Sequence, residues 1–234
     1  SLQSKIKRLK KIINNMKIDN LFISSNENVC WLLNIRGRDL PNSPVANFQA
    51  IFTNRKKIFL FGDIRKLKKL KKKFSNKNIK FFEKDKFFQI LCSIKGKSFC
   101  IDSKTCSLFN ENLINSKFNI KKRNDPIYIL KSIKNSIEIK NMKDVHIQDG
   151  VAVTKFLYWI KNSNINNLDE IKVEKKLESL RKQSKNYLFP SFDTIAGSGP
   201  NGAIIHYRSN KKTNRTLNKK DLLLLDSGGQ YRWG

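Results

Sequence analysis

The sequence predicts an α/β domain with a mixed sheet and flanking helices, followed by an α+β domain. In the first half of the chain, short apolar runs of strand length alternate with amphipathic runs of helix length, which is typical of a sheet covered by helices. In the second half, two long helical segments precede several short strand segments, the order expected of an α+β domain. The composition changes near residues 122–126, so we predict domains at residues 1–122 and 123–234.

The first predicted domain opens with an amphipathic helix over residues 4–17. Isoleucine and leucine recur there at the three- and four-residue spacing of one helix face, and lysine occupies the other face. A second helix begins at Asn26, a residue type that suits the N-cap position. The other predicted helices are residues 64–74, 87–94 and 107–114, and the predicted strands are residues 21–24, 49–53, 57–61, 79–82, 98–102 and 118–121.

The second predicted domain begins with two capped helices. Asn135 with Glu138 has the spacing of a capping box, in which each residue satisfies a backbone N–H of the other, and so starts a long helix. Asn167 with Glu170 has the same spacing and starts the next helix. Strands are then expected over residues 191–196, 203–207 and 222–226, with a glycine-rich turn over residues 197–202.

The charge of the chain is strongly positive, with a formal net charge of +29. The basic residues are mostly lysine and are spread along the whole length, whereas nucleic-acid sites favour clustered basic residues and arginine. We therefore expect solvated lysines and no specific nucleic-acid partner. No apolar run is long enough to span a membrane, so we expect no membrane partner and a cytoplasmic protein.

The four cysteines have neither the paired spacing of a zinc ribbon nor the density of a disulfide framework. A reducing cytoplasm fits this pattern.

Asp226 is the first candidate for chemistry, because it directly follows five consecutive leucines. An ionised carboxylate at the end of so apolar a strand is costly unless it is paired, hydrogen-bonded or bound to metal. The alternative is a strand-end aspartate whose oxygen accepts hydrogen bonds from the following Ser-Gly-Gly turn. A divalent cation needs several ligands, so Asp226 alone is not a metal site.

His206 is the second candidate, in an apolar segment that we expect to be a strand. It is interpreted either as a half-buried histidine with its hydrogen bonds satisfied or as a donor that contacts a reacting amide. The other histidine, His146, lies within the long helix and is interpreted as a surface or packing residue.

Several short motifs, taken together in their order and spacing, resemble the aminopeptidase P family of pita-bread metallopeptidases. The motifs are Ser191-Phe-Asp-Thr-Ile, Gly199-Pro-Asn, His206-Tyr-Arg and Leu225-Asp-Ser-Gly-Gly-Gln-Tyr, and upstream Trp31-Leu-Leu-Asn-Ile-Arg-Gly-Arg-Asp and Asn42-Ser-Pro-Val. The resemblance covers nearly the whole chain. It implies a creatinase/prolidase N-terminal-like domain followed by the N-terminal part of a pita-bread catalytic domain.

The resemblance implies a catalytic centre with two divalent metals, commonly manganese with zinc or cobalt as alternatives, held by two aspartates, a histidine and two glutamates. Asp226 matches the first of these aspartates, and His206 matches a further histidine that contacts the substrate. The second aspartate is expected eleven residues after Asp226, beyond residue 234, so we expect the chain to be an inactive fragment that does not bind metal stably. The family implies peptide substrates with proline at the second position and a homodimeric full-length protein.

Two departures from the family pattern leave the implied ligands intact: Gly229 stands where alanine is frequent, and Arg38 where serine is frequent. Three alternatives stay open. The parent protein could be a prolidase or creatinase on the same fold, a catalytically dead pita-bread module that binds protein or nucleic acid, or a plain nucleic-acid-binding α/β protein.

Overall fold

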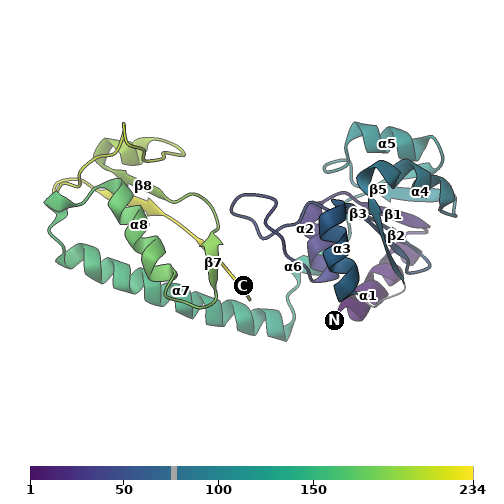
Figure 1. The fold of residues 1–234 in the computed structure, drawn as a ribbon, viewed down its shortest axis with the longest axis horizontal. Coiled ribbons are helices and arrows are strands. Elements are labelled where there is room, and N and C mark those ends of the chain that lie inside the picture. Colours follow the sequence, from purple (N-terminus) through teal and green to yellow (C-terminus); the bar gives the residue numbers. More distant parts are fainter. Residues whose placement is uncertain (75–77, 234) are drawn as a thin grey trace. The chain divides into compact units, whose positions relative to one another are not determined.

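A computed structural model describes residues 1–74 and 78–233 and divides the chain into two compact units. The first unit consists of residues 1–40 and 44–133, and the second of residues 41–43 and 134–234. Their elements are labelled in Figure 1. The domain limits 1–122 and 123–234 stay a prediction.

The first unit forms, among the described residues, a six-stranded sheet with the order β4-β3-β2-β1-β5-β6. Its strands are β1 (Asn20–Ile23), β2 (Gln49–Thr53), β3 (Ile58–Gly62), β4 (Ile79–Glu83), β5 (Ser98–Ile101) and β6 (Asn119–Lys122). Strand β2 is antiparallel to both of its neighbours, and the other pairs are parallel. The predicted mixed sheet is therefore confirmed.

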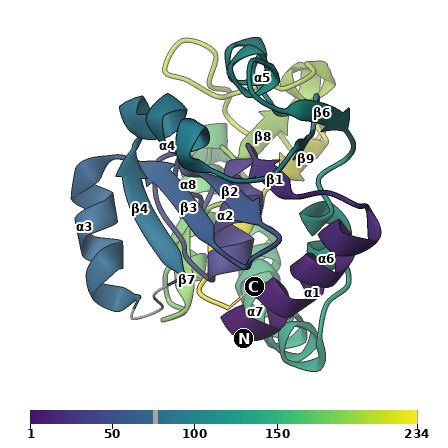
Figure 2. The same cartoon turned by 90° about the vertical axis from the view of Figure 1, so that its right-hand side faces the viewer.

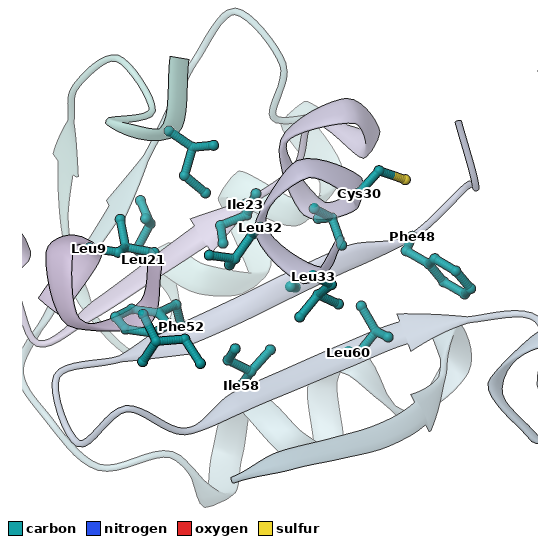
Figure 3. Packing of buried hydrophobic residues seen from close by; sticks show 14 of the residues in the cluster. Leu9, Leu21, Ile23, Cys30, Leu32, Leu33, Phe48, Phe52, Ile58 and Leu60 are labelled. Atoms are coloured by element: carbon teal, nitrogen blue, oxygen red, sulfur yellow. The ribbon is translucent and has the colours of Figure 1, made fainter. Parts of the chain in front are cut away.

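Helices cover both faces of this sheet, because alternate side chains along a strand point to opposite faces and both sets are apolar in the central strands. The helices are α1 (Leu2–Asn15), α2 (Asn26–Leu33), α3 (Ile64–Lys73), α4 (Phe87–Ser93), α5 (Leu108–Asn115) and α6 (Ile127–Ser132), with a 3₁₀ turn η1 (Lys84–Lys86). Helices α1, α2, α3 and α6 pack on the face that carries Leu21 and Ile23, part of the cluster drawn in Figure 3. Helices α4 and α5 pack on the other face, around Phe22 (Figure 2).

Helix α2 starts one residue earlier than an N-cap at Asn26 would place it. Ser25, not Asn26, occupies the N-cap position, and no side-chain hydrogen bond caps the helix. The predicted Asn26 cap is therefore wrong, and packing of the apolar face of α2 on the sheet accounts for the helix without it.

Two carboxylates are buried beyond the carboxyl ends of β5 and β6. Asp125 accepts hydrogen bonds from the Ile127 N–H (2.9 Å) and from the Asn28 amide (2.8 Å), and its own N–H donates to Asp102 Oδ2 (2.9 Å). Burial outweighs these hydrogen bonds and raises the pKa of Asp125 to about 6. The amide oxygen of Asn28 is buried beside this group without a hydrogen-bond partner.

The second unit contains, among the described residues, two helices and two small antiparallel sheets. Its elements are α7 (Ser136–Asn162), η2 (Ile165–Asn167), α8 (Glu170–Arg181), β7 (Tyr187–Pro190), β8 (Ile195–Ser198), η3 (Gly199–Ala203), β9 (Leu223–Asp226) and β10 (Gly229–Tyr231). Strand β10 pairs with β7, and β9 pairs with β8. A core that includes Phe156, Val173 and Ala196 joins α7, α8 and β8, and this helix-then-strand order confirms the predicted α+β class.

The first capping box of this unit is confirmed, and the second is wrong. Asn135 and Glu138 make both reciprocal hydrogen bonds at the start of α7. At the start of α8 the N-cap is Asp169, whose carboxylate accepts from the Lys172 N–H at 2.8 Å. Asn167 lies in η2, and the carboxylate of Glu170 is used by tertiary contacts instead.

The strand predictions for this unit hold in part. A strand over residues 222–226 is confirmed as β9, whereas the expected strand over residues 191–196 is replaced by β7 and β8, with a bend between them. The expected strand over residues 203–207 is wrong, because the chain there leaves η3 through a turn. Strand β10 was not predicted, since three residues after a glycine pair carry too little periodicity.

A buried ion pair joins the two helices to β10. Arg181 Nε donates to Asp149 Oδ1 at 2.7 Å, and the Tyr231 hydroxyl donates to the same oxygen at 2.6 Å. Desolvation opposes ionisation of Asp149, but the hydrogen bonds from Arg181 and Tyr231 outweigh it and lower the pKa of this carboxyl. Burial and the bond to Asp149 raise the pKa of Tyr231.

No helix of the described residues combines the length and the apolar character needed to cross a membrane.

We predict that Asp125 makes the first unit less stable as the pH rises from about 4 to about 6. The folded unit binds the proton of Asp125 more tightly than the unfolded chain, so stability is lost as the pH rises from the unfolded value of 3.8 through the folded value of about 6. The free energy of unfolding should fall by on the order of 3 kcal/mol across this window. Urea-dependent amide hydrogen exchange of the first unit at several pH values measures it.

The matched variant is Asp125→Asn, which should remove this part of the pH dependence. Asn28 can rotate its amide so that its unpartnered oxygen accepts a hydrogen bond from the new amide. If the free energy of unfolding depended equally on pH in the variant and the wild type, the prediction would be contradicted.

We predict that Arg181→Met destabilises the second unit by about 3 kcal/mol, because it leaves Asp149 without its buried cation. Lys182→Met is the control, since Lys182 forms an exposed pair with Glu178 and its loss should cost about 0.5 kcal/mol or less. Hydrogen exchange of the second unit in urea measures both. The prediction fails if the two variants unfold at the same urea concentration.

Candidate functional site

Asp226 lies at the end of β9, with its side chain on the solvent face of the β8–β9 sheet. Leu223 and Leu225 pack against the core of the second unit, whereas Leu224 is 44% exposed on the same face as Asp226. The five leucines are thus not a continuously buried strand. The expected burial cost of Asp226 is wrong, because alternation places the carboxylate in water.

The Asp226 carboxylate is free to bind a cation. Within the described residues no hydrogen bond or ion pair holds it. Carboxylate oxygen is a hard ligand that suits divalent cations. However, no group of three or more histidine, cysteine, aspartate or glutamate side chains that could hold a metal is found among the described residues. Asp226 therefore fits one ligand position of a metal site, and the described residues do not complete the set.

His206 is exposed and lies in a turn three residues after η3. Its φ of 55° places it in the left-handed region, which is uncommon for a residue other than glycine and in which histidine is enriched. The interpretation of His206 as a half-buried strand histidine is wrong. The side chain is accessible, and η3 packs against both β8 and the strand that carries Asp226.

The glycine that opens η3 is required by a close approach. Gly199 has a φ of 55°, and a Cβ atom there would lie 2.7 Å from Asp221 Oδ2. The Gly-Pro-Asn motif thus starts a tight turn that carries the chain from β8 to His206.

The buried carboxylate of Glu170 holds this turn, although Glu170 was expected to cap the helix. The Glu170 side chain accepts hydrogen bonds through Oε1 from the Ser198 N–H (2.7 Å) and through Oε2 from the Tyr207 hydroxyl (2.6 Å). The Asn201 amide lies 3.0 Å from Oε1, and the Arg215 N–H donates to Oε2 at 3.1 Å. Burial, followed by the bond to Glu170, raises the pKa of the Tyr207 hydroxyl.

One feature of the sequence could have indicated this role. Asp169 and Glu170 stand next to each other at a helix start, and only one side chain can cap the helix, so the other is available for a different partner.

Motif segments that are far apart in the sequence meet on the second unit. Arg208 forms an ion pair with Asp193. The side chain of Asn42 donates to Asp193 Oδ1 at 2.9 Å, and Gln230 Nε2 donates to the Asn42 carbonyl at 3.3 Å. The structure therefore brings together the Asn42, Ser191–Ile195, His206–Arg208 and Gly229–Tyr231 segments, which the sequence could connect only through resemblance.

His146 lies apart from these segments, as an exposed residue of α7 whose Nδ1 is 2.8 Å from the Met142 carbonyl of its own helix. Its interpretation as a helix-surface residue is confirmed. The four cysteines are all free thiols.

Comparison with known proteins gives a family for each part of the chain, and both families agree with the resemblance found in the sequence. Residues 1–138 match the Creatinase/Prolidase N-terminal domain family, and residues 140–234 match Metallopeptidase family M24. Xaa-Pro aminopeptidase 1 of Dictyostelium discoideum is 33% identical over 235 residues, which are 97% of this chain and 37% of that protein.

Solved structures share the fold as well. An X-prolyl aminopeptidase from Caenorhabditis elegans, described as a cytosolic enzyme with a di-nuclear active site, superimposes with a TM-score of 0.87 at 25% identity over 100% of this chain and 40% of that one. The prolidase from Pyrococcus horikoshii gives a TM-score of 0.72 at 25% identity, over 98% of this chain and 61% of that one.

The chain spans about 40% of the length of the curated relatives it matches. These matches confirm the resemblance to the Xaa-Pro aminopeptidases and their pita-bread relatives. Because residues 1–138 are more than half of the chain, the protein belongs to the creatinase/prolidase N-terminal domain family, and it continues into a segment of metallopeptidase family M24.

Proposed function

We propose that the full-length product of the gene encoding this chain is a metal-dependent Xaa-Pro aminopeptidase, a hydrolase that removes an N-terminal residue preceding proline. The observation that carries the proposal is the convergence of the motif segments on the second unit, with His206 and Asp226 both exposed there. The relatives named Xaa-Pro aminopeptidase support it.

Asp226 would be one ligand of the metal centre. Two divalent ions, Mn²⁺ in this proposal, would polarise the scissile carbonyl and supply an activated water when bound. The carboxylate of Asp226 contributes a hard oxygen that no other side chain of the described residues competes for. The described residues contain no group of three or more such ligands, so we expect the 234-residue chain not to hold these ions stably.

His206 would contact the substrate and assist proton transfer. The bond before proline is a tertiary amide, so its nitrogen carries no hydrogen and must gain a proton before it can leave. An exposed imidazole can hold a proton at Nδ1 or Nε2 and donate it to that nitrogen.

We place the enzyme in the cytoplasm as a homodimer that acts on peptides with proline at the second position, without a specific nucleic-acid partner. Residues 1–122 would form the N-terminal-like domain, and residues 123–234 the first part of the catalytic domain.

We predict that the 234-residue chain with Mn²⁺ does not cleave an Xaa-Pro-Xaa tripeptide above a blank without protein, whereas the full-length product does. In the full-length product, Asp226→Asn should abolish this cleavage, because an amide is a weaker metal ligand than a carboxylate. Asp144→Asn, on the exposed surface of α7, is the control and should retain full activity. Release of the N-terminal residue measures all four proteins.

Turnover by the isolated chain would contradict the need for further metal ligands, and turnover by the Asp226→Asn protein would contradict the assigned role of Asp226. Cleavage of Xaa-Pro dipeptides alone would replace the aminopeptidase by a prolidase.

We predict that His206→Ala lowers the kcat/KM of the full-length product by about 100-fold, the usual contribution of a positioned proton donor. The chain offers a matched control, because His146 is the other histidine and is also exposed. His146→Ala should leave kcat/KM unchanged. A comparable loss in both variants would show that His206 has no particular role.

A further inference from the structure

We propose that Glu170 is a positioning residue, which clamps the segment from Ser198 to Tyr207 and so fixes the backbone on which His206 is presented. The inference rests on the proposed role of His206 in the reaction.

The clamp acts on both sides of His206. Oε1 of Glu170 accepts a hydrogen bond from the backbone N–H of Ser198, at the end of β8. Oε2 accepts one from the hydroxyl of Tyr207. The chain between these two residues runs through η3 and the turn. One rigid carboxylate therefore sets the distance between the start and the end of the segment that carries His206.

The hydrogen bond between Tyr207 and Glu170 also determines the direction of the adjacent His206 side chain. The Tyr207 side chain is 5% exposed, and its hydroxyl reaches Glu170 and also lies 3.0 Å from the Thr213 carbonyl. Because the Tyr207 ring points inward from a turn, the adjacent His206 is directed outward and adopts its left-handed backbone. A strained residue of this kind persists when its surroundings over-determine it.

The clamp depends on the direction of hydrogen bonds rather than on a salt bridge. Glu170 is 0% exposed, and its partners are the N–H and O–H groups of Ser198, Asn201, Tyr207 and Arg215. The guanidinium group of Arg215 is directed to Asp221 at 3.5 Å. Replacing one carboxylate oxygen by an amide NH₂ therefore presents a donor to another donor at almost unchanged volume.

The first experiment uses the 234-residue chain and NMR. In Glu170→Gln, the Ser198 and Arg215 amides should exchange at least about tenfold faster than in the wild type, in line with the loss of a hydrogen bond to a charged group. The ¹³Cα and ¹³Cβ shifts of His206, which report its left-handed backbone, should move toward averaged values. The ¹³C shifts are native-state signals that a uniform loss of stability would not change, and the faster exchange should be confined to these amides, whereas a uniform loss of stability would also speed exchange elsewhere in the second unit.

Two matched controls accompany this experiment. Glu178→Gln makes the same change on the same helix at an exposed pair and should leave the His206 shifts unchanged. Should Glu170→Gln fail to fold, Tyr207→Phe keeps both the ring and the carboxylate and should still release His206, whereas Tyr158→Phe, on the exposed surface of α7, should not. Unchanged His206 shifts in both clamp variants would overturn the proposal.

The second experiment tests whether Glu170 acts through His206. In the full-length product, Glu170→Gln should lower kcat/KM in the wild-type background and cause no further loss in the His206→Ala background. Additive losses would overturn the positioning role and leave a general structural one. An inactive wild type would refute the proposed peptidase, while the NMR result still decides whether the clamp exists.

Discussion

Three chain segments of the second unit converge on the side chain of Glu170 at the start of α8, and the local structure around His206 depends on that convergence. The carboxylate connects the start of α8 with the end of β8, with the turn after η3 and with the loop before β9. A fully buried acceptor must find donors, because an unpaired carboxylate in the interior is costly. This requirement selects the loop conformation more strongly than any local propensity of the loop residues.

The first unit follows a different constraint, the burial of both faces of a sheet. Its strands carry apolar side chains on each face, so helices must cover both, and the resulting layers are those of an α/β domain. Polar groups are tolerated where the strands end. Asp102 and Asp125 lie there, each with backbone N–H partners, because the carboxyl ends of strands leave donors that the sheet does not use.

The two candidate site residues are both exposed on the second unit. Exposed apolar side chains occur in the same segments, with Leu222 exposed to 89% and Ile205 to 86%. The largely buried polar contacts of this unit are the Glu170 hydrogen bonds and the Asp149 network, whereas the Asp193 ion pair is exposed. Buried hydrogen bonds to Glu170 thus hold the segment that carries the exposed His206.

Local patterns in the sequence determined most of the elements of this protein. Apolar periodicity located α1 and the strands of the first unit, and the Asn135–Glu138 box located the start of α7, because these signals depend on residues a few positions apart. The motif resemblance also selected His206 and Asp226 as candidate site residues. Only the tertiary structure decided that residues 203–207 form a turn, that Leu224 faces solvent, and that Glu170 binds a distant loop instead of capping its helix. These outcomes depend on the hydrogen-bond partners that surround a buried polar group and on which face of a strand another element covers. Both are contacts between distant segments, and residue spacing along the chain does not determine them.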